Sequence, residues 1–179
     1  MYFELKENRP HGTPEHPFSL YHIKNVPHAF QIPVHWHDEL EIIYVKSGSV
    51  HVTISGEHYI GNPGDAFVVS PGSLHFMGSH TGDVDYYTFL FPLEFVSFQM
   101  NDLSEQMLMA PLKSGRMLFQ IQIGKSIEDL CEHLLVLYAR EGDVRNPIRT
   151  TVPKDSAKRI SFVAKQMETK MILLEFLQR

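Results

Sequence analysis

The chain is poor in cysteine, with Cys131 as the single one among 179 residues. One thiol excludes a framework of internal disulfides, and its place in an apolar helical pattern favours a small buried side chain over a reactive one. No run of about 18 apolar residues is present to span a bilayer. The charged residues between positions 4 and 9 leave no apolar core for a signal peptide. We therefore expect a cytoplasmic protein that does not bind membranes.

Positive charge is also scarce. The chain has 16 Lys and Arg against 21 Asp and Glu, a formal charge of −5, and the basic residues are scattered rather than clustered. Because a phosphate backbone is bound by clustered positive charge, we do not expect this segment by itself to bind nucleic acid electrostatically. Internal repeats, low-complexity segments and a nucleotide-binding loop are absent from the sequence as well.

Histidine, in contrast, is abundant, with 11 residues. Several lie in a proline-rich leader, so abundance alone is weak evidence for a site. The stronger signal is the order His35, His37, Glu41, Gly48 and His75. Three imidazoles and one carboxylate are ligands that a divalent transition metal prefers, so the stretch predicts a site for Zn, Ni, Mn or Fe, or the remains of one.

The residue pattern divides the chain into three parts. Residues 1–33 are rich in proline and predict an irregular or extended N-terminal arm with a first edge segment. Residues 34–124 alternate short β-branched and aromatic runs with turn residues, which is typical of an antiparallel sandwich or barrel. Strands are predicted at 41–46, 49–54, 66–70, 84–91 and 116–123, with hairpins around Ser47-Gly48 and Ser55-Gly56.

From Ser126 the apolar period changes to about 3.6, which predicts a helix that ends at Gly142, and a second helix is predicted at 156–178. Residues 125–179 thus form a two-helix region of the same structural domain. The second helix carries an apolar stripe wider than one barrel wall needs, for which we expect a dimer interface; the alternative is the core face of an ordinary helix. The stripe includes Val163, Met167, Met171, Leu174 and Leu177.

Strand geometry limits how the four polar residues can meet. Side chains alternate along a strand, so His35 and His37 share one face and Trp36 points the other way. On a straight strand Glu41 would lie about 13 Å beyond His37, too far to share an ion. The chain must therefore reverse at residues 38–40, and the segment 64–72 can then bring His75 from the neighbouring wall.

The same residues resemble a known family. Residues 35–48, HWHDELEIIYVKSG, are similar to the first cupin motif. Gly64, Gly72 and His75 resemble the second, although Ser70 stands where that motif has proline and Ser79 where it has asparagine.

More narrowly, residues 35–45 followed by GNPGDAFVVSPGSLH look like the N-terminal effector-binding domain of AraC-type transcriptional regulators. Residues 89–95, FLFPLEF, and the two terminal helices also look like that family's pattern, and the resemblance covers about residues 10–179. It implies an arm, a cupin-like antiparallel β-barrel of jelly-roll type, and two helices that dimerise.

The resemblance further implies a sensor of a small molecule, such as a sugar, rather than an enzyme. DNA binding would belong to a C-terminal pair of helix-turn-helix units, and residues 125–179 show no such pattern. The expected partners are therefore a small-molecule effector, a second copy of the chain, and DNA only through a domain that this chain lacks.

Several interpretations of the site stay open. The residues with candidate ligand contacts are His35, His37, Glu41, His75, Trp36 and Tyr44. The polar four would hold either a metal or a metal-free network around water or effector. The alternative function is a metal-dependent cupin enzyme of isomerase or dioxygenase type, although the sequence offers no clear general acid or base beyond Glu39 and the tyrosines. A carbohydrate-binding module is disfavoured, because it would not need the terminal helices.

Overall fold

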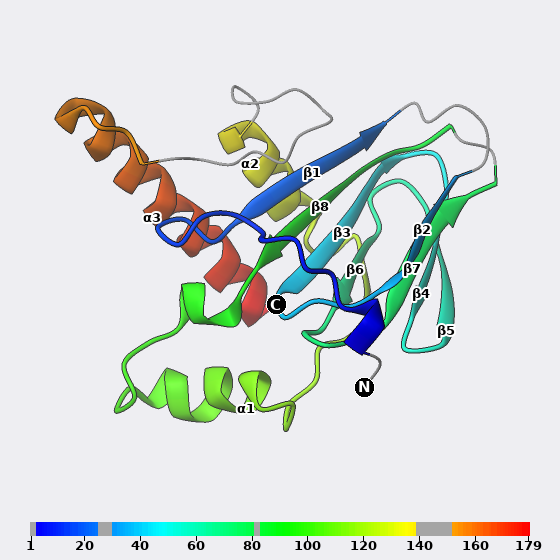
Figure 1. Cartoon of the computed structure of the whole chain (residues 1–179), viewed down its shortest axis with the longest axis horizontal. Helices are drawn as coiled ribbons and strands as arrows, with labels where there is room; N and C mark the ends of the chain where they lie inside the picture. Colours follow the sequence, from blue (N-terminus) through cyan, green and yellow to red (C-terminus); the bar gives the residue numbers. More distant parts are fainter. Residues whose placement is uncertain (1–2, 25–29, 81–82, 139–151) are drawn as a thin grey trace.

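The computed structural model describes residues 3–24, 30–80, 83–138 and 152–179, and its body is two antiparallel sheets that face each other (Figure 1). One sheet has the order β1-β8-β3-β6-β9 and is called the helix-covered sheet; the other, β2-β7-β4-β5, is called the open sheet. The strands are β1 (Ser19–Lys24), β2 (Phe30–His35), β3 (Leu40–Ser47), β4 (Val50–Ile54), β5 (Glu57–Gly61), β6 (Ala66–Val69), β7 (His75–Ser79), β8 (Asp85–Phe91) and β9 (Gln122–Gly124).

The first eight strands pair from the two ends of the series inward. β1 pairs with β8, β2 with β7, β3 with β6 and β4 with β5, all antiparallel. A long antiparallel ribbon rolled up in this way into two facing sheets is a jelly roll. The predicted fold class, a cupin-like antiparallel barrel followed by helices, is confirmed.

Four of the five predicted strands are present as β3, β4, β6 and β8. The turn at Ser55-Gly56 is a hairpin, because β4 pairs with β5. The predicted hairpin at Ser47-Gly48 is wrong, because β3 and β4 lie in different sheets. Gly48 there has φ +77° and an added Cβ would lie 2.0 Å from the Asp83 carbonyl oxygen, so this crossing between the sheets requires glycine.

The first 33 residues are more regular than an irregular arm. They contain β1 and most of β2, which form the outermost strand of the helix-covered and the open sheet respectively. We predicted one edge segment in this part of the chain, and the structure has two edge strands, β1 and β2. The prolines obscured the second, because Pro33 lies within β2, where an outermost strand tolerates the missing N–H.

The predicted strand at 116–123 is wrong except at its end, where β9 begins at Gln122. Gly115, with φ +69°, ends the short helix α1 (Ala110–Lys113), and Leu118 is 77% exposed. Phe119 does not pair in a sheet but stacks on Phe176 of α3. The alternation of apolar residues thus arises from contacts with different partners rather than from one buried strand face.

Two apolar cores lie on the two faces of the helix-covered sheet. Ile43 and Val45 of β3 pack between the sheets, whereas Leu40, Ile42 and Tyr44 of the same strand pack against the helices. All six residues from Leu40 to Val45 are buried. Because the side chains of a strand alternate, this one strand connects the space between the sheets with the helical layer.

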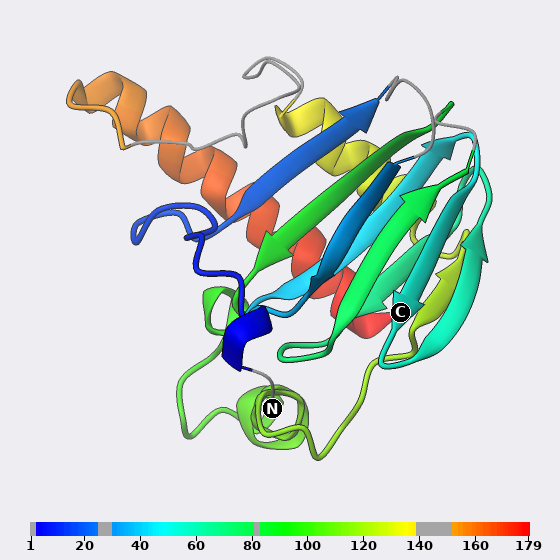
Figure 2. The same ribbon diagram turned by 45° about the vertical axis from the view of Figure 1, so that its right-hand side comes forward.

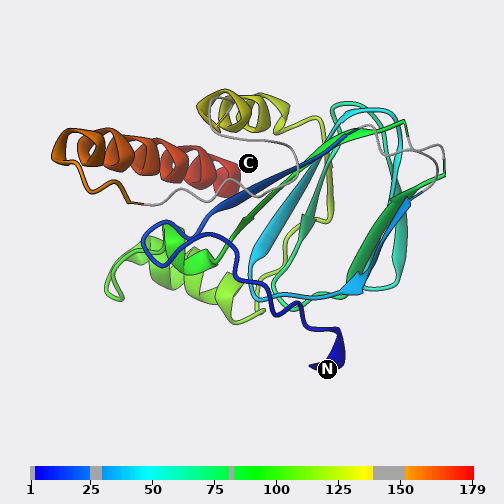
Figure 3. The ribbon, with the colours of Figure 1, turned by 45° about the horizontal axis from the view of Figure 1, so that its top comes forward.

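The helical layer consists mainly of α2 (Glu128–Tyr138) and α3 (Ser156–Gln178). Figure 3 shows the two side by side on the far side of the helix-covered sheet from the open sheet, and Figure 2 shows α3 crossing behind β1 and β8. The predicted helices are confirmed where the structure describes them; the predicted end at Gly142 lies outside the described residues. The short elements are η1 (Phe3–Leu5), η2 (Leu93–Val96) and η3 (Glu105–Met109), the last a π-helical turn.

Among the described residues, no helix has the length and apolar character needed to cross a membrane.

Candidate functional site

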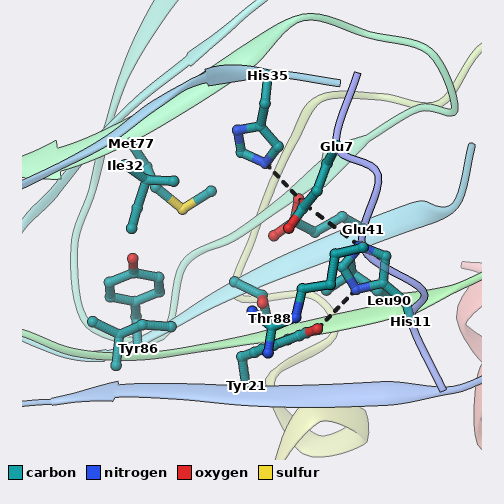
Figure 4. A pocket seen from close by; sticks show the side chains of 12 residues that line it. Glu7, His11, Tyr21, Ile32, His35, Glu41, Met77, Tyr86, Thr88 and Leu90 are labelled. Atoms are coloured by element: carbon teal, nitrogen blue, oxygen red, sulfur yellow. Dashed lines mark hydrogen bonds and ion pairs between the residues drawn. The ribbon is translucent and has the colours of Figure 1, made fainter. Parts of the chain in front are cut away.

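The four polar residues of the motif meet at one end of the space between the sheets. His35 is the last residue of β2 and pairs across the open sheet with His75, the first residue of β7. His37 lies in the segment between β2 and β3, and Glu41 is the second residue of β3 in the helix-covered sheet. Figure 4 shows His35 and Glu41 pointing toward the same space from opposite sides.

This convergence differs from the predicted route. We expected the chain to reverse at residues 38–40 and to place Glu41 on a strand beside the histidines. Instead the segment crosses from the open sheet to the helix-covered sheet, so Glu41 faces the histidines across the gap. His75 likewise lies in the same sheet as His35 and not on a neighbouring wall. The expected proximity is correct, although the geometry that produces it was not.

Backbone carbonyls orient all three imidazoles. The Nδ1 atoms of His35, His37 and His75 lie 2.8, 3.1 and 2.9 Å from carbonyl oxygens two residues away. Because a carbonyl oxygen can only accept, each Nδ1 carries the proton and donates it. The Nε2 atom of each neutral ring then has a free lone pair. The three rings also offer ligand atoms that all lie within 4.8 Å of one another.

Glu41 contacts two of these rings. Its Oε2 lies 3.1 Å from His37 Nε2, which donates a hydrogen bond when the ring carries a second proton, and 3.0 Å from His75 Nε2. The second contact has the distance of an ion pair but not the alignment of a hydrogen bond, so the buried His75 Nε2 makes none. Burial opposes the charge on Glu41, but these contacts hold the pKa of its carboxyl far below the usual range.

The imidazoles differ in their response to this carboxylate. Burial opposes a charge on His37, but its hydrogen bond to Glu41 and the charges of Glu41 and Glu39 raise the pKa of the His37 ring. Burial and the neighbouring His75 lower the pKa of His35 instead. The ionised Glu41 thus requires a positive neighbour, which is either a proton on His37 or a cation among the three rings.

These observations fit a transition metal. The three rings have Nδ1–H groups bonded to protein oxygens, which is the arrangement that orients metal-bound histidines. The buried His75 Nε2 lacks a hydrogen bond, as a ligand atom would before it binds an ion. His35, His37 and His75 would hold the metal, and Glu41 is the adjacent carboxylate but not a member of the group within 4.8 Å.

A cavity of about 200 Å³ adjoins the histidines between the sheets. Its lining is apolar at one end and polar at the other, as Figure 4 shows with Met77, Ile32 and Tyr86 grouped apart from Glu7, His11 and Glu41. The full lining is Glu7, Arg9, His11, Tyr21, Ile23, Ile32, His35, Glu41, Met77, Tyr86, Thr88 and Leu90.

Three of the lining residues come from the start of the chain and were not predicted. Glu7 Oε2 lies 3.5 Å from His11 Nε2 and 3.7 Å from His35 Nε2, and His11 Nδ1 lies 2.8 Å from the Tyr21 hydroxyl. The Arg9 guanidinium lies over the Tyr21 ring at 5.2 Å. In the sequence these residues were only part of a polar, proline-rich leader, and no local pattern marked them as cavity residues.

The arm is held in this place by the segment that carries the motif. The Glu7 N–H donates to the Trp36 carbonyl at 2.9 Å, and the Trp36 N–H donates to the Leu5 carbonyl at 3.1 Å. Lys6 Nζ lies 2.5 Å from the Asp38 carboxylate. The position of the arm is thus tied to residues 36–38, directly beside the histidines.

Of the six predicted ligand contacts, only His35 and Glu41 line the cavity. His37 and His75 contact Glu41 from outside that lining, whereas Trp36 and Tyr44 have other surroundings. Trp36 is 3% exposed and its ring lies below the Lys6 ammonium, so it is a packing residue rather than an open stacking platform. Tyr44 faces the helical layer, where its hydroxyl donates to Glu132 at 2.6 Å. The strand alternation that places Glu41 inside places Tyr44 outside, because the two are three residues apart.

The predicted dimerisation residues divide into two groups. Val163, Met167 and Met171 are 49%, 60% and 68% exposed on α3. Leu174 and Leu177 are partly buried against the core beneath the helices. The opposite face of α3, which includes Phe162, Leu173 and Phe176, is buried. The helix therefore has a core face distinct from the predicted stripe, most of which remains exposed.

Comparison with solved structures gives partial likenesses. The chain is 27% identical to KdgF from Halomonas sp. (37% of this chain, 61% of that one, TM-score 0.35) and 30% identical to an RmlC-like cupin from Shewanella frigidimarina (35%, 57%, TM-score 0.33). A cupin protein from Bacteroides fragilis is 24% identical (42%, 64%, TM-score 0.36). In each case the chain spans less than two thirds of the matching structure, and the fold assignment rests on the strand order instead. No curated protein matches the chain.

A family model gives the stronger result. The model of the AraC-like ligand binding domain matches residues 11–148, which include strands β1 to β9, the three histidines of the site and α2. The arm residues Glu7 and Arg9 and the helix α3 lie outside the match. With more than half of its length matched, the chain belongs to the AraC-like ligand binding domain family.

Proposed function

We propose that this chain is the effector-sensing and dimerisation part of a transcription regulator whose DNA-binding units lie in another part of the protein. The observation that carries the proposal is the cavity between the sheets, because a ligand-binding family member needs a site and this one has convergent polar groups beside an apolar wall. A concave, largely preformed space of this kind is the usual form of a small-molecule site.

A route from the cavity to the helices supports a sensing role. Glu7, Arg9 and His11 line the cavity. A few residues further on, the buried His16 bonds through Nε2 to the Tyr138 hydroxyl of α2 at 2.8 Å, and that hydroxyl lies 2.8 Å from Thr169 Oγ1 of α3. An effector that contacts the arm would therefore act on a segment that is packed into both helices.

The extent to which an effector can change the arrangement of the arm and helices is limited by how much more tightly it binds one arrangement than the other. An effector shifts the equilibrium between two arrangements of arm and helices only by its differential affinity for them, about tenfold for each 1.4 kcal/mol. A ligand held equally well in both arrangements would leave the helices unchanged.

A ligand screen by thermal unfolding tests the site. We expect ligands to raise the melting temperature of the wild type and of His51→Trp, which changes the outer face of the open sheet, but not of Ile32→Trp, which fills the cavity. Each variant's own unfolding transition verifies that it folds. Ligands that stabilise Ile32→Trp as much as the wild type would contradict the proposed site.

The exposed part of α3 supports the homodimer. Val163, Met167 and Met171 lie on one side of the helix at three- and four-residue spacing, together with Ile160, which is 74% exposed. Beside them runs a groove between α2 and α3 that includes Met167 and Met171. Exposed apolar stripes of this kind are unfavourable in a monomer and are covered in an assembly.

Sedimentation equilibrium tests the dimer. Met167→Glu should weaken self-association at least about tenfold, because a charge would enter the apolar interface. Ser161→Glu is the matched control, since Ser161 is exposed on a different side of α3. Equal effects of the two substitutions, or a monomeric wild type, would count against α3 as the interface.

The regulator assignment has its own test in the gene. The reading frame beyond the codon for Arg179 should encode two helix-turn-helix patterns within about one hundred residues, the length that two such small units need. A following region without them would remove the proposed role in transcription.

A metal-dependent cupin enzyme is the second candidate, favoured by the convergence of His35, His37 and His75. A bound metal would supply Lewis acid chemistry. Glu7 and His11 are side chains of the lining that are suited to proton transfer, whereas burial and the nearby Glu41 raise the pKa of the Tyr86 hydroxyl well above its usual range and keep it protonated. Metal analysis of protein purified without a histidine tag tests this candidate: an absence of metal that persists after incubation with Zn, Mn, Ni or Fe salts would exclude it.

A further inference from the structure

The cavity between the sheets is small and divided, and both properties restrict its ligand. Its volume is about 200 Å³. A cavity of about 150 Å³ holds one benzene molecule, so the space accepts a single ring or a short branched chain with one small substituent. A disaccharide or a nucleotide is too large.

The apolar end disfavours a polyhydroxylated ligand. Ile23, Ile32 and Met77 offer no hydrogen-bonding side-chain group, and the Tyr86 hydroxyl is the single polar side-chain atom grouped with them among the described lining residues. A monosaccharide carries hydroxyls around its whole ring, and most of those that faced this end would lose water without gaining a partner, since the Tyr86 hydroxyl can serve only one or two of them. The sugar suggested by family resemblance is therefore a poor match to the lining. The body of the ligand should be apolar.

The polar end determines the charge of the ligand's head group. Each of the two carboxylates is already next to two imidazoles: Glu7 next to His11 and His35, and Glu41 next to His37 and His75. A cationic head group would have to compete with these contacts.

The donor groups at the polar end, in contrast, have few acceptors within the described ranges. Arg9 forms no ion pair with any residue in the described ranges, and its guanidinium rests on the Tyr21 ring. The Nε2 atom of His11, a side chain only 3% exposed, has no hydrogen bond within the same ranges, because Glu7 is at ion-pair distance. The Arg9 guanidinium, without an ion-pair partner in the described ranges, and His11 Nε2, whose 3.5 Å contact with Glu7 lacks hydrogen-bond alignment, match a carboxylate, whose two oxygens are acceptors only.

We infer that the effector is a small carboxylate with a compact apolar body, its carboxylate directed to Arg9 and His11 and its body packed against Ile32, Met77 and Tyr86. This inference rests on the proposed function, because it places the ligand in the same cavity. Arg9 is then the residue that selects for a negative head group, and the apolar end selects for size.

Titration calorimetry with four probes of similar size tests the inference. Benzoate, benzamide, benzylammonium and glucose differ mainly in head-group charge and in the polarity of the body. We expect benzoate to bind at least about tenfold more tightly than benzamide, and benzylammonium and glucose more weakly than either. In Arg9→Gln the advantage of benzoate over benzamide should disappear, while benzamide binding stays within about twofold of wild type.

Arg116→Gln is the matched control, since Arg116 is an exposed arginine that does not line the cavity. It should retain the wild-type preference. Equal binding of benzoate and benzamide to the wild type, an unchanged preference in Arg9→Gln, or failure of all four probes would overturn the inference.

The outcomes also separate this inference from the proposed function. If glucose binds most tightly and Ile32→Trp abolishes that binding, the ligand class is wrong but the cavity remains the sensing site. If benzoate binds equally to the wild type and to Ile32→Trp, the ligand lies elsewhere, and both the inference and the proposed site fail.

Discussion

The two sheets that enclose the cavity differ in what lies on their outer faces. The helix-covered sheet is buried on both sides, with Ile43 facing the cavity layer and Ile42 facing the helices. The open sheet presents its outer face to solvent, where His58 is exposed and Ile60 is 55% exposed. Only the helix-covered sheet therefore contacts both the cavity layer and the helices, whereas the open sheet contributes cavity-lining residues such as His35, Ile32 and Met77 but has no helix packed on its outer face within the described residues.

The largest expected effect is the loss in free energy of unfolding when a side chain between the helix-covered sheet and the helices is removed. Phe89 is fully buried on the outer face of the helix-covered sheet, so Phe89→Ala should lower the free energy of unfolding by about 3–5 kcal/mol. Urea unfolding followed by circular dichroism measures this. A loss below about 1 kcal/mol would show that the helices do not pack there as described.

Substitution of a histidine on the inner face of the open sheet should lower the affinity for Zn far more than substitution of one on its outer face. His75→Ala removes one of three convergent rings and should weaken Zn binding about a hundredfold, whereas His58→Ala, on the outer face, should leave it within about twofold. Competition with a chromogenic chelator measures both. Equal losses would mean that the metal does not bind at the inner histidines alone but also on the outer face, where His51, His58 and His80 line a groove.

The two faces of β3 should differ in their influence on ligand binding. Tyr44→Phe removes the hydrogen bond to Glu132 and should lower the free energy of unfolding by about 1 kcal/mol. Because Tyr44 faces away from the cavity, the affinity for benzoate measured by titration calorimetry should change less than about twofold. A larger change would restore Tyr44 as a ligand contact.

The smallest effect is expected on the open face. His51→Ala alters a side chain that borders the outer groove and makes a ring contact with His80. Surface substitutions of this kind change the free energy of unfolding by about 0.5 kcal/mol or less. A clear destabilisation in thermal unfolding would indicate that this face is not simply solvated.

Much of the fold could be predicted from local pattern. The alternation in residues 41–46 and the 3.6-residue period in 156–178 report which side chains are buried, and β3 and α3 follow from them. The strand predicted at 116–123 failed because Phe119 and Ile121 are partly buried against different partners, Phe176 and the core between the sheets. Periodicity records burial but not the surface that provides it.

The candidate site was predictable in its residues but not in its layout. His35, His37, Glu41 and His75 were identifiable because their chemical types and spacing are unusual. The sequence did not identify the sheet to which Glu41 belongs, because a crossing between two sheets and a hairpin within one sheet use the same turn residues. Glu7, Arg9 and His11 were missed because their contacts with Tyr21 and His35 depend on where the arm packs, which no local signal encodes.

A crystal structure of the protein grown with Zn²⁺ and benzoate tests the central claim most directly. The account predicts anomalous scattering from an ion bound to His35, His37 and His75, and benzoate beside it with its ring against Ile32 and Met77 and its carboxylate toward Arg9. An empty cavity, with both additives bound on the outer face of the open sheet or absent, would contradict the claim that the space between the sheets is where this domain senses its ligand.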